Sequence, residues 1–169
     1  MSTNASDLFI TGLKNAHAME SQALSIMRPQ LQRIENYPMV AQRLQQHIGE
    51  TEQQVARIEQ LLDDVGADKS PLKDAALSAA GTMAAVGHAF AGDEIIKNAF
   101  ANHAFENFEI AAYTSLCTLA ELSGQAAAVP VLQQNLAEEE AMAQWIIDNL
   151  PELTTEYASR RQVGEEAKR

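Results

Sequence analysis

The chain has 169 residues, a formal net charge of −11 and a pI near 4.7. Such an acidic surface repels nucleic acid and anionic lipid, and we find no basic patch that would offset it, so neither is an expected partner. The composition is rich in Ala, Gln, Glu and Leu, which favours helix, and the length suits a single domain over residues 1–169.

The compartment is suggested by two further features of the sequence. Cys117 is the only cysteine, so no intramolecular disulfide can form, which fits a reducing cytosol. The N-terminus lacks the basic and apolar regions of a signal peptide, and no stretch approaches the ~18 apolar residues of a membrane span. We therefore expect a cytoplasmic protein.

The first part of the chain predicts two long helices. Apolar residues that step by three and four predict a helix over residues 4–33, with Pro29 as a kink or an early end of its regular part. The stretch "ENYP" at 35–38 reads as a turn, and a second periodic segment predicts a helix over 39–65. Gly66, which opens "GADKSP", suits the C-terminal cap of that helix.

The second part begins with a stretch of small residues and then repeats the pattern of long helices. Residues 71–90 predict a shorter, close-packed helix within a long connection, and two long helices follow at 93–122 and 126–149. Pro151 is expected to end the last helix and leave a tail at 152–169. This order predicts an all-α, ferritin-like four-helix bundle with a long crossover connection that contains the extra helix.

Two carboxylates stand in an apolar stretch of the third long helix. The sequence "HAFENFEIAAY" at 103–113 puts Glu106 and Glu109 three residues apart, so both point to the same side of the helix. Burying an unpaired carboxylate costs several kcal/mol or more unless a partner or a metal meets it. The rest of the chain should therefore supply a cation or a metal-binding partner.

A weak internal repeat supplies candidates on the other helices. Aligning 47–54 with 135–142 places Glu50 opposite Glu138, and aligning 17–24 with 106–113 places Glu20 opposite Glu109. One carboxylate from each of four helices is what a bundle needs to hold two metal ions, and iron and manganese accept carboxylate oxygen and imidazole nitrogen. We therefore expect two divalent ions, iron or manganese, as cofactors. The candidate ligands are Glu20, Glu50, Glu109, Glu138, Glu106 and His47.

Some of these assignments have alternatives. The apolar seam of the last helix would place Glu139 inward, whereas the repeat selects Glu138, which we favour. His47 could be a ligand or a hydrogen-bonding support, and each glutamate could instead be a core-edge residue that reaches solvent or an arginine. Glu50 and Glu138 are followed three residues later by Gln53 and Ala141, not by the usual histidine. The candidates for the surroundings of the site are His17, Glu139, Gln54 and Tyr113.

At these residues the chain resembles the YciE/YciF family of ferritin-like bacterial proteins, with YciE as the nearest match. The similar stretches cover nearly the whole chain in order: "AHAMESQA", "IENYP", "QHIGET", "DEIIK", "FENFEIAAYTSL" and "EEEAMAQWIIDNLPE". The resemblance implies a dimetal centre, a homodimer and a link to bacterial stress responses. It implies no particular reaction.

Three functions fit these expectations. The first is a dimetal oxidoreductase of the peroxidase, catalase-like or ferroxidase type, which would react with oxygen or peroxide. The second is a stress-related helical interaction protein whose metal site is structural or vestigial. The third, storage in a cage or a DNA-protecting shell, ranks last, because the chain has no basic tail and resembles dimers.

Overall fold

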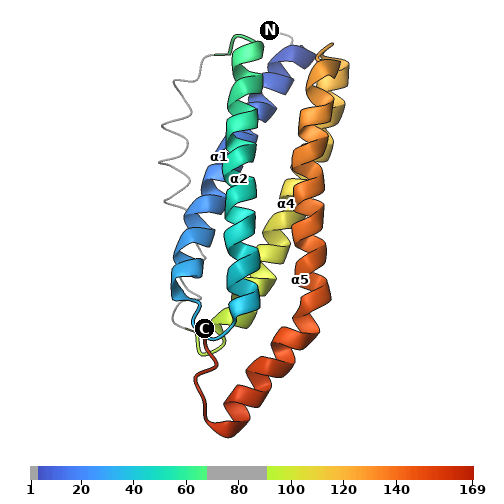
Figure 1. Cartoon of the computed structure of the whole chain (residues 1–169). Helices are drawn as coiled ribbons and strands as arrows, with labels where there is room; N and C mark the ends of the chain where they lie inside the picture. The colour runs from blue at the N-terminus through green and yellow to red at the C-terminus, as the bar shows by residue number, and fades with distance from the viewer. Residues whose placement is uncertain (1–3, 68–90) are drawn as a thin grey trace.

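The computed structural model describes residues 4–67 and 91–169, and these form two helical hairpins packed side by side (Figure 1). The first hairpin contains α1 (Ala5–Arg33) and α2 (Pro38–Asp64), and the second contains α4 (Glu94–Leu122), the short 3₁₀ helix η2 (Ala126–Ala128) and α5 (Val129–Val163). The predicted all-α, ferritin-like four-helix bundle is confirmed. The extra helix expected over 71–90 lies outside the described residues.

Local signals in the sequence account for several helix ends. Asn4 caps α1, because its Oδ1 accepts a hydrogen bond of 2.8 Å from the backbone N–H of Asp7. α1 continues past Pro29 to Arg33, so this proline does not end the helix. Gly66 follows α2 with φ of 65°, the left-handed conformation that glycine adopts at least cost, as expected for a C-terminal cap.

The expected end of the last helix at residue 149 is wrong, and so is the expected tail at 152–169. α5 passes through Pro151 and ends only at Val163, before Gly164. A proline inside a helix removes one backbone hydrogen bond, but here burial of the following turn offsets that loss. Leu153 is 6% exposed and packs with Tyr37 and Ile95 at the base of the bundle.

The last residues of the chain return to this base (Figure 1). The Tyr37 hydroxyl donates to the carbonyl of Ala167 at 2.6 Å, and the backbone N–H of Ile95 donates to the carbonyl of Lys168 at 2.9 Å. The N–H of Asn36 donates to the carbonyl of Arg169 at 3.2 Å. The C-terminal segment thereby joins the α1–α2 turn to the start of α4.

The core contains two large apolar layers with a polar layer between them, and the smaller cluster of Tyr37, Ile95 and Leu153 lies at the base. In α1, Leu13 belongs to the upper apolar layer and Met27 to the lower one, and the buried Glu20 lies between them in sequence. In α5 the same order holds for Leu132, Glu139 and Met142. No helix among the described residues is long and apolar enough to cross a membrane.

Candidate metal centre

Four buried side chains converge in the polar layer. His47 from α2, Glu106 and Glu109 from α4, and Glu139 from α5 each offer one ligand atom, and these atoms all lie within 4.8 Å of one another. We call these four residues the carboxylate cluster. Their side chains leave almost no surface to solvent, so solvation by bulk water cannot offset their charges.

Glu20 brings a carboxylate from α1 to the edge of the cluster. It is fully buried, and its Oε1 accepts a hydrogen bond from the Tyr113 hydroxyl. That hydroxyl accepts in turn from Nδ2 of Asn135 at 3.0 Å. Burial raises the pKa of Glu20 to about 8, and the negative charge of Glu139 adds to the rise. All four long helices therefore contribute to the polar layer.

His47 is held so that one ring nitrogen faces the cluster. Its Nδ1 lies 2.9 Å from Oε2 of Glu50, and its Nε2 lies 3.1 Å from Oε2 of Glu106 and 3.4 Å from Oε2 of Glu139. Arg43 binds Glu50 from the other side, with Nη1 3.1 Å from Oε2. A carboxylate behind a histidine fixes the ring and its tautomer, an arrangement common in metal sites.

Without a metal, the cluster retains protons at neutral pH. Burial raises the pKa of Glu106 to about 7, despite the opposing contact with His47, and burial with the charge of Glu20 holds the pKa of Glu109 well above its usual range. Burial alone would lower the pKa of His47, but hydrogen bonds to Glu106, Glu139 and Glu50 outweigh it and raise the pKa to about 12. Protons thus take the place of other cations.

The oxygen atoms of this layer are short of donors. In the part of the chain that the structure describes, the buried oxygens Glu20 Oε2 and Glu109 Oε1 have no hydrogen-bond partner. Glu106 Oε2 and Glu139 Oε2 have only the single Nε2 of His47 to share, at 3.1 and 3.4 Å. Unmet acceptors of this kind are rare in folded proteins and call for a bound ion or water. Four carboxylates and one imidazole suit iron or manganese, and two divalent ions would neutralise the four negative charges.

The two adjacent glutamates of α5 are placed opposite to our preference. Glu139 lies in the cluster, whereas Glu138 is 21% exposed and pairs with Arg57 at 2.9 and 3.0 Å. Leu132 and Ile146 lie seven residues before and after Glu139 and share its buried helical face. This apolar seam predicted the inward-facing glutamate better than the repeat did. The short internal repeat was misleading because it compared sequence letters and ignored the helical face.

Glu50 also differs from expectation. It was expected among the ligands, but its two oxygens accept from Arg43, Gln46 and the His47 ring, and its side chain is 21% exposed. These contacts hold the pKa of Glu50 near 2, with the His47 bond as the largest cause. Glu50 therefore lies behind His47 and outside the cluster.

The residues expected around the site have separate roles. Gln54 is buried and donates from Nε2 to Glu139, and also to Glu138 at 3.0 Å, while Tyr113 donates to Glu20. His17 lies apart from these contacts and bonds through Nε2 to Oε1 of Glu59 at 3.0 Å. Whether any residue of the layer ligates a metal remains a prediction.

Two arginines that the sequence did not single out hold glutamates at the outer edge of the site. Arg57 bonds to Asn135 and Glu138, and Arg43 bonds to Glu50. Both lie on α2. Arg43 is four residues before His47, and Arg57 is three residues after Gln54. Helical spacing could therefore have identified them as the partners that hold Glu50 and Glu138 toward the surface.

Comparisons with known proteins agree with this architecture. A family model described as "Domain of unknown function (DUF892)" matches residues 4–159. A crystal structure of a protein from Xanthomonas campestris pv. campestris is similar at 28% identity, covers 94% of this chain and 99% of that one, and superposes with a TM-score of 0.78. YcfI from Rhodopseudomonas palustris, described as a candidate structural protein, is similar at 26% identity. The match covers 85% of this chain and 92% of that one, with a TM-score of 0.63.

Proposed function

Because the chain belongs to the family described as a domain of unknown function, DUF892, its function must be argued from the site, and we propose a dimetal carboxylate protein. The family is the YciF-like group, which supports the resemblance found in the sequence. We assign the metal-holding role to His47, Glu106, Glu109 and Glu139, with Glu20 as the further carboxylate.

The observation that carries the proposal is the convergence of four ligand atoms within 4.8 Å in a fully buried layer. An acidic cluster at a surface is common without a metal, but here desolvation acts on every member, and Glu20 Oε2 and Glu109 Oε1 have no donor among the described residues. A carboxylate buried without a partner costs several kcal/mol, and a bound cation removes that cost. Two ions of charge +2 balance Glu20, Glu106, Glu109 and Glu139.

The surrounding residues suit redox-active ions. Iron or manganese bound here would supply electron transfer to a small oxidant such as oxygen or peroxide. Gln54 holds Glu139, Tyr113 holds Glu20, and Glu50 orients the His47 ring, so each of these hydrogen bonds keeps a metal-binding group in place. The apolar layers above and below limit the entry of water.

A second function has one observation in its favour. The cluster contains a single imidazole, and carboxylates that merely need neutralisation would be satisfied by metal ions with no reaction. In that case the ions stabilise the bundle and the function lies in a partner surface. Peroxide turnover by the metal-loaded protein separates the two, because a purely structural site would leave peroxide unchanged.

The first experiment is elemental analysis of protein from cells supplied with iron and manganese. We expect about two ions per chain in the wild type and loss of metal in Glu109→Gln, which keeps the shape of the side chain but removes its charge. Glu138→Gln is the matched control, since Glu138 faces Arg57 outside the cluster. Folded wild-type protein without metal, or equal loss in both variants, would reject the proposal.

The remaining parts of the proposal rest on the family resemblance. We expect a bacterial, cytoplasmic homodimer of the YciE type with a role in stress responses. Large apolar side chains exposed on α1 and α4 suit a contact between copies, among them Leu8 at 47% and Phe108 at 62% exposure. Sedimentation equilibrium of the wild type beside Phe108→Glu tests the dimer.

A further inference from the structure

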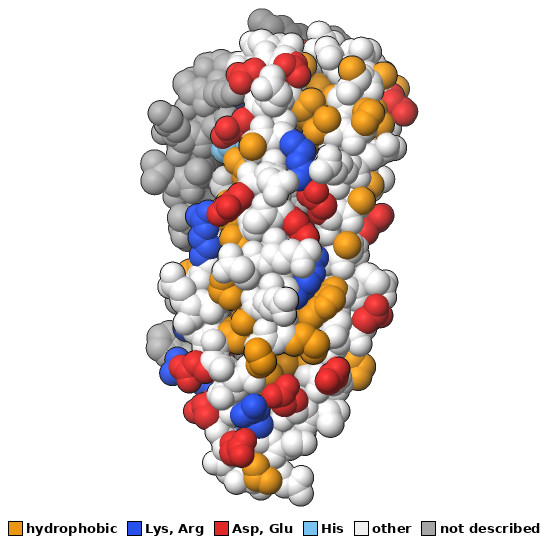
Figure 2. Space-filling view, viewed as in Figure 1, with side chains coloured by type: hydrophobic (Ala, Val, Ile, Leu, Met, Phe, Trp, Pro, Cys, Tyr) orange, Lys and Arg blue, Asp and Glu red, His pale blue; other side chains and the backbone are white. Residues whose placement is uncertain are grey.

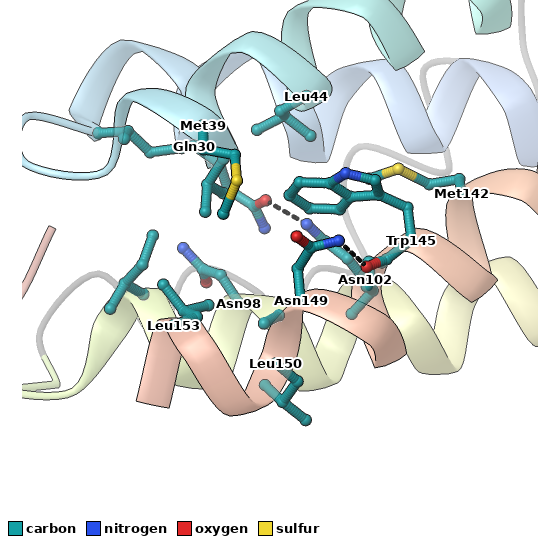
Figure 3. Close-up of a pocket in the computed structure, with 15 residues that line it drawn as sticks. Gln30, Met39, Leu44, Asn98, Asn102, Met142, Trp145, Asn149, Leu150 and Leu153 are labelled. Carbon is teal, nitrogen blue, oxygen red and sulfur yellow. Dashed lines mark hydrogen bonds between the residues drawn. The ribbon is translucent and has the colours of Figure 1, made fainter. Parts of the chain in front are cut away.

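A cavity lies among the apolar side chains around Leu44, Met142 and Ile146, and Figure 3 shows the residues that line it. It has a volume of about 40 Å³ and is lined by residues of α1, α2, α4 and α5. Apolar side chains such as Leu44, Ile95, Met142 and Trp145 form most of its wall. A single water needs about 10–15 Å³ by this measure, so the cavity holds about three waters or one molecule of a few non-hydrogen atoms.

The cavity adjoins the cluster on three helices. Leu44 precedes His47 by three residues on α2, Asn102 precedes Glu106 by four on α4, and Met142 follows Glu139 by three on α5. Residues three or four apart share a helical face at a rise of about 5–6 Å. The near end of the cavity therefore lies about one helical turn from three of the four cluster residues, and its far end reaches Ile95 and Leu153.

The polar part of the lining is uncharged. Figure 3 shows the amides of Gln30, Asn98, Asn102 and Asn149 gathered inside the ring of apolar side chains. Nδ2 of Asn102 donates to Gln30 at 2.9 Å, and Nδ2 of Asn149 donates to the Trp145 carbonyl at 2.8 Å. Asn98 is 7% exposed, and its Oδ1 accepts no hydrogen bond among the residues the structure describes.

The cavity opens between α2 and α5, the side on which the helices of the bundle pack more loosely than within either hairpin. Met39 at this opening is 41% exposed, and Trp145 and Leu150 are half-buried. Figure 2 shows hydrophobic side chains gathered between these helices in the lower half of that face. Displacement of one flexible methionine side chain would widen the entry.

We propose that this cavity binds a small uncharged molecule with a hydroxyl or primary amide group and presents it to the carboxylate cluster. The unmet Asn98 oxygen requires a hydrogen-bond donor, and the other amides offer further donors and acceptors. Among residues 4–67 and 91–169, no lysine, arginine or histidine lines the cavity, so a carboxylate or phosphate would meet no counter-charge from them. Hydrogen peroxide and short alcohols share the required chemistry.

The presentation of the ligand to the carboxylate cluster rests on the proposed function. The binding of the ligand in the cavity does not. The probe is therefore 1-propanol, which is not an oxidant, and its charged counterpart is propanoate. NMR spectra of the protein with zinc added in place of a redox-active metal report on the side-chain amides of Asn98, Asn102 and Asn149. We expect saturable shifts of these signals with 1-propanol and none with propanoate.

The variant Ala99→Leu fills part of the cavity, because Ala99 is in its wall. Ala104→Leu makes the same change at an exposed position of α4 and is the matched control. We expect Ala99→Leu to weaken 1-propanol binding at least tenfold and Ala104→Leu to leave it unchanged. If Ala99→Leu does not fold, Asn98→Leu replaces it, since leucine removes the amide at similar size.

Equal binding in wild type and Ala99→Leu, binding of propanoate as tight as that of 1-propanol, or the absence of saturable shifts would each overturn the proposal. A second arm adds hydrogen peroxide to iron-loaded protein and follows the iron absorption spectrum. Slower change in Ala99→Leu than in Ala104→Leu supports delivery to the cluster, and equal rates reject it. Wild-type protein that binds 1-propanol but no metal would reject the proposed function and retain the binding site.

Discussion

The protein buries carboxylates in two regions, and these regions differ in the cationic side chains that pair with the carboxylates. At the base of the bundle, Glu94 is 1% exposed and meets Arg33 at 2.6 Å and Lys168 at 3.7 Å. In the polar layer, Glu106, Glu109 and Glu139 are buried around one histidine, and no lysine or arginine bonds to them among the described residues. The base thus has a lysine and an arginine for one carboxylate, whereas the polar layer has only the His47 ring for several.

The difference separates a structural role from a binding role. A buried carboxylate with protein cations is complete within the chain, and its removal should affect folding and little else. Carboxylates without such cations must take up protons or metal ions, so their state depends on pH and on the solution. Perturbed ionisable groups of this second kind are more often found at functional sites.

The largest effect is expected at the base. Arg33→Met removes the closer cation from Glu94 and should cost about 3 kcal/mol of stability, because the buried carboxylate keeps only the more distant Lys168. Metal content should stay that of the wild type. Thermal unfolding and elemental analysis measure the two quantities. Arg28→Met is the control, since its partner Glu52 is half-exposed and the loss should be below about 1 kcal/mol. A loss of metal in Arg33→Met would contradict the comparison.

The pH dependence of the metal-free protein tests the polar layer. The pKa values of Glu106 and Glu20 rise from 4.5 to about 7 and about 8 on folding. The folded state therefore binds more protons than the unfolded state above pH 4.5, and stability should fall as the pH rises through 8. We expect a loss of roughly 2 kcal/mol or more between about pH 5 and 8, seen as a fall in Tm by several degrees.

Two changes should remove this trend. Saturating metal replaces the protons, so the Tm of the loaded protein should vary little over the same range, and metal uptake at pH 6 should release protons. Glu20→Gln should flatten the trend in the metal-free protein, because the amide does not titrate. A metal-free protein that gains stability from pH 5 to 8 would contradict the assignment of protons to the cluster.

A smaller effect is expected behind His47. Glu50→Ala frees Nδ1 of the ring, and loss of such a support typically weakens metal binding 10–100-fold. Metal competition titrations measure this change. Glu52→Ala on the same helix also removes an arginine-paired carboxylate, but one remote from the ring, and should leave the affinity unchanged. Equal affinities in all three proteins would place His47 outside the metal-binding groups.

The smallest effect is expected where the C-terminal segment meets the base. Tyr37→Phe removes the buried hydrogen bond to the Ala167 carbonyl and should cost about 1 kcal/mol. Tyr157→Phe removes a hydroxyl 3.4 Å from the Gly92 carbonyl in an exposed contact, and should cost less. Chemical denaturation of the two variants measures the difference. If both lose the same stability, the contact of Ala167 contributes little to the base.

The sequence was a good guide to the helices because periodicity and caps act locally. Asn4, Pro38 and Gly66 mark the helix ends at which the structure finds them. Pro151 was misread, since a local rule about proline competes with burial of Leu153 against Tyr37, which lies 116 residues earlier in the chain. That contact has no trace in the sequence near residue 151.

The candidate site was predictable only as far as the helical face was used. Glu106 and Glu109 follow from their spacing in an apolar helix, and His47 and Glu20 follow from their seams. Glu50 and Glu138 lie outside the carboxylate cluster, because each pairs with an arginine of α2, Arg43 or Arg57. Neither arginine was considered when these glutamates were predicted as ligands. Which of two adjacent glutamates turns inward depends on such pairs as much as on the apolar pattern.

The polar layer also divides the hydrophobic core, and this bears on how the protein opens. The apolar layers around Leu13 and Met27 form separate clusters of buried residues, and the partly buried Phe105 packs against both. Backbone amides in the two halves should therefore exchange hydrogen as separate cooperative units in metal-free protein. Ions that bind all four helices at the polar layer would join these units, so one pair of ions would set the cooperativity of the entire bundle.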